Sequence, residues 1–155
     1  MEAVRRSVAV LATGVAVVML ALGSVAAADD GGRPLSTALT GAEEAPNPGD
    51  PNATGQADLR FNQGQNEVCF EISWADVDGT VFAGHIHVAP AGDAGPVVVT
   101  LFTGSFAGTD SVSGCAQNVD PELIKAIRKN PTEYYVNVHS RPNFPGGAVR
   151  GQLGD

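Results

Sequence analysis

The chain contains little positive charge and few charged residues of any kind. Of its 155 residues 17% are charged, and nine Lys and Arg stand against 17 Asp and Glu, which gives a formal net charge of −8. Proteins that bind nucleic acid use Lys and Arg to neutralise phosphates, so this balance argues against a nucleic-acid partner. We expect an unknown extracytoplasmic ligand or protein partner instead.

Long apolar runs are absent except for one at the N-terminus. The chain starts MEAVRR, is uncharged from Ser7 to Ala28, and turns acidic at Asp29. This order is typical of a secretory signal peptide, residues 1–28, cleaved after the small residues that end at Ala28. An uncleaved anchor is the alternative, because about 20 apolar residues span a bilayer. Both readings place the rest of the chain outside the cytoplasm, with membrane contact only through such an anchor.

Cysteine is also scarce, with Cys69 and Cys115 the two examples. In an exported chain an even number of cysteines favours a disulfide, and two free buried thiols are the alternative. No G-x-S-x-G nucleophile elbow occurs, and a disulfide would occupy both cysteines, so neither Ser-His-Asp nor Cys-His catalysis finds support. The sequence indicates no catalytic residue, and an enzyme is the less favoured class.

The remainder has the turn-rich composition of an all-β domain, with 19 Gly and 10 Pro in the chain. We expect a flexible N-terminus over 29–35 and one domain over 36–155. Short apolar or alternating segments separated by Gly, Pro, Asn and Asp predict strands at 35–39, 55–62, 67–74, 80–88, 97–102, 106–113, 134–139 and 148–153. Asp120 as cap, Pro121 in the first turn and Pro131 beyond the end predict one helix, about Pro121–Lys129.

Side chains alternate across a strand, so parity separates a core face from a second face. The predicted core positions are Val68, Phe70, Ile72, Trp74, Phe82, Ile86, Val88, Tyr134, Val136, Val138, Val149 and Leu153. The opposite parity collects His85, His87, Tyr135, Asn137, His139, Arg150 and Gln152. If the last two strands lie near the HIH strand, these polar residues share one face of one sheet.

All three histidines of the chain belong to this second face. His85 and His87 are two residues apart in a strand, which is how a sheet presents two imidazoles to one ion, and His139 from another strand would add a third. The alternative is that the imidazoles hydrogen-bond across a polar face. By contrast, Glu43, Glu44 and Asp50 lack the regular spacing of calcium ligands, and we expect them in a solvated loop.

Several motifs together resemble the CHRD (chordin-type) domain, in the form common among exported bacterial proteins. They are LTGAEEAPNP, ATGQADL, FEISW, AGHIHVAPAGDAGPVVVTL and YYVNVHSRPNFPGGAVRGQL, and they cover about 36–153. The resemblance implies an immunoglobulin-like, Greek-key β-sandwich with distant similarity to copper/zinc superoxide dismutase. In chordin these domains belong to an antagonist of bone morphogenetic proteins, but the domain itself has no settled biochemical function.

The similarity to the dismutase implies specific roles for individual residues. His85 and His87 look like its pair of copper ligands, His139 like a further copper ligand, and Arg150 like its anion-guiding arginine. The dismutase has zinc-binding histidines between these blocks, whereas this chain has no histidine between His87 and His139. A zinc–copper pair is therefore excluded, and a single copper ion with three histidine ligands is the metal site that remains.

The sequence thus favours an exported, single-domain, non-catalytic CHRD module that binds an unknown ligand. It establishes no cofactor, and copper is the one that the histidines allow. The alternative is a mononuclear copper-binding protein with dismutase-like or copper-storage behaviour. Its ligands would be His85, His87 and His139, with Arg150 beside the open position.

Overall fold

The computed structural model describes residues 34–154, which form eight strands, one α-helix and two short 3₁₀ turns. The predicted signal peptide lies outside these residues. The strands are β1 (Leu35–Thr40), β2 (Thr54–Asn62), β3 (Glu67–Ala75), β4 (Thr80–Val88), β5 (Val97–Thr103), β6 (Ser111–Ala116), β7 (Tyr134–Arg141) and β8 (Val149–Gln152). Helix α1 (Pro121–Lys129) precedes β7, and the turns are η1 (Gly41–Glu43) and η2 (Pro131–Glu133). The all-β class and the single short helix are both confirmed.

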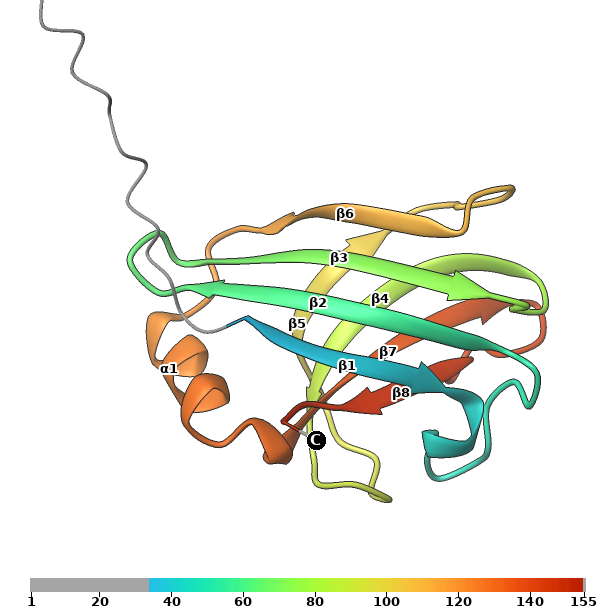
Figure 1. Cartoon of the computed structure of the whole chain (residues 1–155), viewed down its shortest axis with the longest axis horizontal. Helices are drawn as coiled ribbons and strands as arrows, with labels where there is room; N and C mark the ends of the chain where they lie inside the picture. Colours follow the sequence, from blue (N-terminus) through green and yellow to red (C-terminus); the bar gives the residue numbers. More distant parts are fainter. Residues whose placement is uncertain (1–33, 155) are drawn as a thin grey trace, which may run out of the picture.

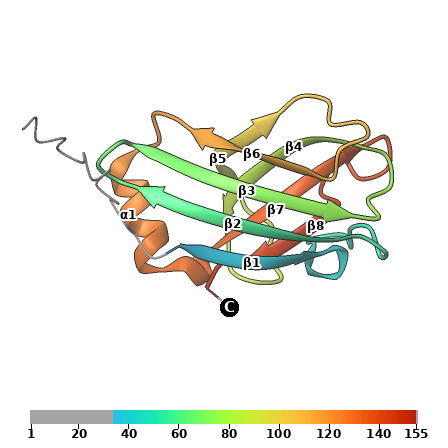
Figure 2. The same ribbon diagram turned by 45° about the horizontal axis from the view of Figure 1, so that its top comes forward.

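The strands pair antiparallel in the order β5-β4-β7-β8-β1-β2-β3-β6, and the sheet bends into two layers. Figures 1 and 2 show β1, β2, β3 and β6 in one layer and β5, β4, β7 and β8 in the other. One residue pair, Thr40 with Arg150, connects the layers through β1 and β8. Strand β7 returns beside β4 after β5, β6 and α1, a long connection of the kind found in Greek-key sandwiches.

The space between the layers is filled by the predicted core face. Ile72, Ile86 and Val136 are fully buried there, together with most of the apolar residues of matching parity. Helix α1 covers one end of this core with Ile124 and Ile127, both inaccessible to solvent. Asp120 caps the helix by accepting a hydrogen bond from the Glu122 amide at 2.9 Å.

The expected strand over 106–113 is wrong in position, because β6 occupies Ser111–Ala116. Phe106 instead lies in the preceding loop, where its ring packs edge-on to Phe102 at 5.1 Å and to Trp74 at 6.3 Å. Gly108 has a φ of 74°, a conformation that glycine tolerates and that ends extended backbone. The apolar side chain thus fills the gap between β3 and β5 rather than marking a strand.

The expected core position of Phe82 is also wrong. A register shift between Val81 and Ala83 in the β4–β7 ladder turns Val81 into the core, where it is 2% exposed. Phe82 falls on the other face, with its ring centroid 5.9 Å from that of His139 and the Arg141 guanidinium carbon 3.9 Å from its centre. A β-bulge reverses parity locally, and sequence alternation alone does not reveal one.

In the described part of the chain, no helix has the length and apolar character needed to cross a bilayer. Cys69 and Cys115 are directly paired across β3 and β6 and form the expected disulfide. This bond connects β6, an edge strand, to its neighbour β3.

Replacing both Cys69 and Cys115 with Ser should lower the free energy of unfolding by about 4 kcal/mol, the loop-entropy value for a loop of this length. Denaturant unfolding of the variant against wild type measures this difference. Mass spectrometry after alkylation without reductant should find no modified thiol in wild type. Two modified thiols in freshly isolated protein would contradict the disulfide.

Ile86→Asp should destabilise the fold by several kcal/mol, because it buries an unpaired carboxylate between the layers. His85→Ala on the neighbouring position should cost much less, since His85 is half-buried on the other face. Thermal unfolding compares the two. A larger loss for His85→Ala would show that the face assignment of β4 is wrong.

Candidate metal centre

The pairing of β4 with β7 brings the three histidines to one face. His85 lies opposite Asn137, His87 opposite Tyr135, and Ala83 opposite His139. The neighbouring strand β8 adds Arg150 opposite Asn137 and Gln152 opposite Tyr135. All the residues that sequence parity assigned to the second face therefore lie together on three adjacent strands.

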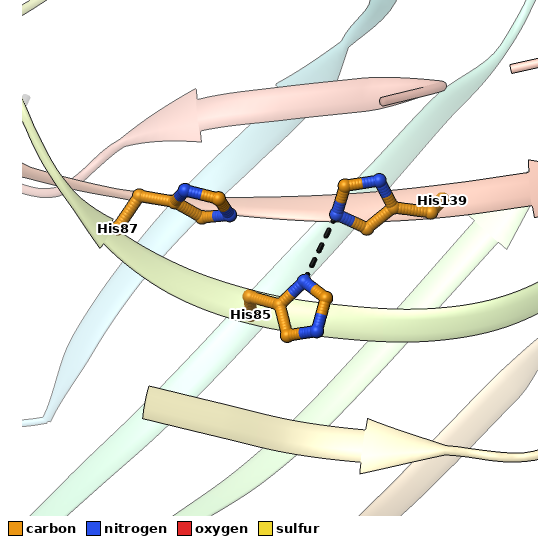
Figure 3. Close-up of side chains that lie close together, drawn as sticks. All are labelled: His85, His87 and His139. Atoms are coloured by element: carbon orange, nitrogen blue, oxygen red, sulfur yellow. Dashed lines mark hydrogen bonds between the residues drawn. The ribbon is translucent and has the colours of Figure 1, made fainter. Parts of the chain in front are cut away.

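The imidazole rings converge. His85 Nδ1 lies 3.0 Å from His139 Nε2, and one ligand atom from each of the three histidines lies within 4.8 Å of the others. Figure 3 shows a ring nitrogen of His87 pointing toward the His85–His139 pair. The spacing approaches the roughly 3–4 Å between two nitrogens that share a zinc or copper ion with bonds of about 2.0–2.1 Å.

Backbone carbonyls determine which nitrogens are free to bind. Nδ1 of His87 lies 2.8 Å from the Gly95 oxygen, and Nδ1 of His139 lies 3.1 Å from the Pro145 oxygen. A carbonyl oxygen only accepts, so both Nδ1 atoms must donate, and the Nε2 atom of each neutral ring carries the lone pair. His85 Nδ1 then donates to His139 Nε2. In the other tautomer of His85 the proton lies on Nε2, and the lone pair on Nδ1 faces the Nε2 atoms of the other two histidines.

This face is covered rather than solvated. His87, Asn137 and His139 are 8%, 2% and 7% exposed, and His85 is half-buried. Within residues 34–154, His87 Nε2, Asn137 Oδ1 and Glu44 Oε1 are buried without a hydrogen-bond partner. A buried polar atom without a partner costs about 1–3 kcal/mol, so a bound group that satisfies His87 Nε2 would be favoured.

Burial also keeps the histidines neutral. Desolvation, then the proximity of His139 and His87, lowers the pKa of His85 to about 4. Desolvation likewise lowers the pKa of His87, against the opposing effects of the Gly95 carbonyl and the neighbouring Asn137 side chain. It also lowers the pKa of His139, against the opposing effect of the hydrogen bond to Pro145. At neutral pH all three imidazoles are in the form that ligates metal.

Arg150, predicted to guide anions, is placed in a different environment. It is 1% exposed, and its guanidinium donates to the carbonyls of Asp93 and Pro90 and to Gln152 Oε1 at 2.8–3.0 Å. These guanidinium N–H groups therefore donate to acceptors of the same chain. The anion-guiding role stays a prediction that this geometry does not favour.

The expectation of a solvated acidic loop is wrong for two of its three residues. Asp50 is inaccessible and accepts hydrogen bonds from the Asn52 and Asp78 amides, whereas Glu43 is exposed. Glu44 is 9% exposed and packs against Gly147, where an added Cβ would lie 2.3 Å from Glu44 Oε1. The Gly146-Gly147 pair was the one sequence signal for this close approach.

Comparison with known proteins gives a family. The family model described as CHRD domain matches residues 35–153, nearly the whole of the described chain. No curated protein and no solved structure matches this chain.

Glu44→Gln should stabilise the protein more at pH 8 than at pH 4. Burial, opposed by Arg150, raises the pKa of Glu44 to about 7, so the folded state holds this proton more tightly than the unfolded state. The ionised side chain then costs folding free energy above pH 7, by at most roughly 3 kcal/mol, and this cost vanishes below pH 4.5. Urea unfolding at both pH values measures the effect, with the exposed Glu43→Gln as control. An equal effect of the two variants at pH 8 would refute it.

Proposed function

The chain belongs to the CHRD domain family, and on that premise we propose that it is an extracytoplasmic binding module whose ligand is a single copper ion. His85, His87 and His139 would hold the ion. The proposal gives a ligand to a domain that is otherwise a binding module of unknown specificity. It concerns binding, because the described residues offer no group that argues for catalysis.

The observation that carries the proposal is the unpartnered, buried Nε2 of His87. It lies beside two further imidazoles, and its lone pair is directed by the hydrogen bond from Nδ1 to Gly95. Histidines that bind metal commonly donate their other ring N–H to a carbonyl or carboxylate, which sets the tautomer. Both His87 and His139 have that second hydrogen bond here.

The donor set favours copper among the metals. Imidazole nitrogen suits copper, zinc, iron and nickel, and Cu²⁺ binds most tightly of the divalent first-row ions to a given set of such ligands. Calcium and magnesium require oxygen ligands. The distant resemblance to copper/zinc superoxide dismutase supports the same metal and the same three residues.

The cellular location forms part of the proposal. The predicted signal peptide supports export of the bacterial type, and the Cys69–Cys115 disulfide fits an oxidising compartment. Dismutase-like activity is not included, because Arg150 already donates to carbonyls of its own chain. Storage or transfer of copper is the role that a non-catalytic site would serve.

The purified protein should bind one Cu²⁺ per chain with saturation at neutral pH. His87→Ala should weaken binding by at least the roughly 10- to 100-fold that loss of an outer-sphere partner costs, since it removes a ligand outright. Competition against a chelator of known affinity measures both values, and Zn²⁺ in place of Cu²⁺ should bind more weakly.

A control separates this site from nonspecific binding to an acidic protein. Glu122→Gln removes an exposed carboxylate on α1, an element that carries none of the three histidines, and should leave the affinity unchanged. Absence of saturable binding by wild type would refute the proposal. Equal affinities of wild type and His87→Ala would refute it as well.

A further inference from the structure

The most unusual group beside the histidines is the buried guanidinium of Arg150. Among residues 34–154 the one ion pair is Lys125 with Glu122, so no carboxylate lies within ion-pair distance of Arg150. The nearest carboxyl effect is electrostatic, because burial raises the pKa of Glu44 and the Arg150 charge lowers it. The Arg150 charge is balanced by two loop carbonyls, one amide oxygen and the ring of Tyr135, whose centre lies 3.5 Å from the guanidinium carbon. A buried cation is costly, so an arginine kept in such a place calls for a reason beyond packing.

Tyr135 connects this cation to the histidines. Its ring is stacked on that of His87 with centroids 4.8 Å apart and an angle of 10° between the planes. Strand β7 lies between β4 and β8, so His87 approaches Tyr135 from one side and Arg150 from the other. The three planar groups form a stack that restricts rotation of the His87 ring.

A second route connects Arg150 with His87 through the loop between β4 and β5. Arg150 holds the carbonyls of Pro90 and Asp93, and the same loop provides the Gly95 carbonyl that accepts from His87 Nδ1. The Gly95 amide donates to the Tyr135 hydroxyl at 3.3 Å, which ties the loop to the stack. Both routes end at His87 and leave the His85–His139 pair untouched.

We propose that Arg150 and Tyr135 are positioning residues that orient the His87 ring and thereby set the metal affinity of the site. This inference rests on the proposed copper binding. Arg150 holds the loop and the tyrosine ring, and together these aim His87 Nε2 at the other two histidines. We call Arg150, Tyr135 and the loop that they hold the clamp. Without the clamp, the His87 ring rotates and the metal site retains two ligands, His85 and His139.

The decisive comparison is Tyr135→Phe against Tyr135→Leu. Phenylalanine keeps the stacked ring and should bind Cu²⁺ nearly as well as wild type. Leucine removes the ring and should weaken binding about 10- to 100-fold, as loss of an outer-sphere partner does. The electron paramagnetic resonance spectrum of Tyr135→Leu should change from three to two coordinated imidazoles and match that of His87→Ala.

Two further variants separate positioning from stability. Phe102→Leu removes a stacked aromatic ring from the core, on the opposite face of the sheet, and should lower stability while leaving the copper spectrum unchanged. Arg150→Lys keeps the charge but loses the planar group that bonds two carbonyls and stacks on the ring, so it should weaken binding. If Tyr135→Leu does not fold, the copper affinity of Arg150→Lys tests the positioning role in its place.

The histidine ¹⁵N NMR spectrum of the metal-free protein tests the clamp independently. Wild type and Tyr135→Phe should show His87 with its proton on Nδ1, and Tyr135→Leu should lose that fixed tautomer. If wild type does not bind copper, the proposed function fails, while this spectrum still decides whether the clamp exists. Wild-type affinity, a three-imidazole spectrum and an unchanged His87 tautomer in folded Tyr135→Leu and Arg150→Lys would overturn the inference.

Discussion

The antiparallel pairing of β4 with β7 is the constraint on which the site depends. It aligns His85 with Asn137 and places His139 one step along the same face, although 54 residues separate His85 from His139. A slip of one residue would turn every histidine of one strand into the core, where Ile86 and Val136 now meet. The apolar side of these two strands therefore holds the register that the polar side requires.

Loops then convert this polar face into a second interior. The loop after β4 covers His87 and Arg150 with its carbonyls, the β7–β8 loop provides the Pro145 oxygen to His139, and the segment after β1 lays Glu44 against Gly147. Covering a polar face costs desolvation, which is why the pKa of His85 falls to about 4 and that of Glu44 rises to about 7. A neutral, partly unsatisfied set of imidazoles is the result, and it is suited to a metal cation.

Sequence patterns predicted most of the fold because the signals were local. Turn residues separated the strands, and Asp120 and Pro121 marked the start of α1 to the residue. The errors occurred where a contact between distant segments overrode local pattern. Phe106 fills the gap beside Trp74 and Phe102 in place of starting a strand, and a bulge moves Phe82 out of the core. Apolar alternation in the neighbouring residues reveals neither the packing of Phe106 nor the bulge at Phe82.

The candidate site divides in the same way. The sequence alone determined that His85 and His87 share one face of β4, and that Tyr135, Asn137 and His139 share one face of β7, since alternation depends on backbone geometry within each strand. It did not determine the face of Phe82, because the bulge in β4 reverses the alternation there. Tertiary structure decided which strands are neighbours, and so decided that the imidazoles meet, that Arg150 stacks on Tyr135 and that Glu44 is buried. Strand pairing and loop placement are those that give the whole chain its lowest free energy. The local preference of a single residue contributes little to that free energy compared with burial of the entire core.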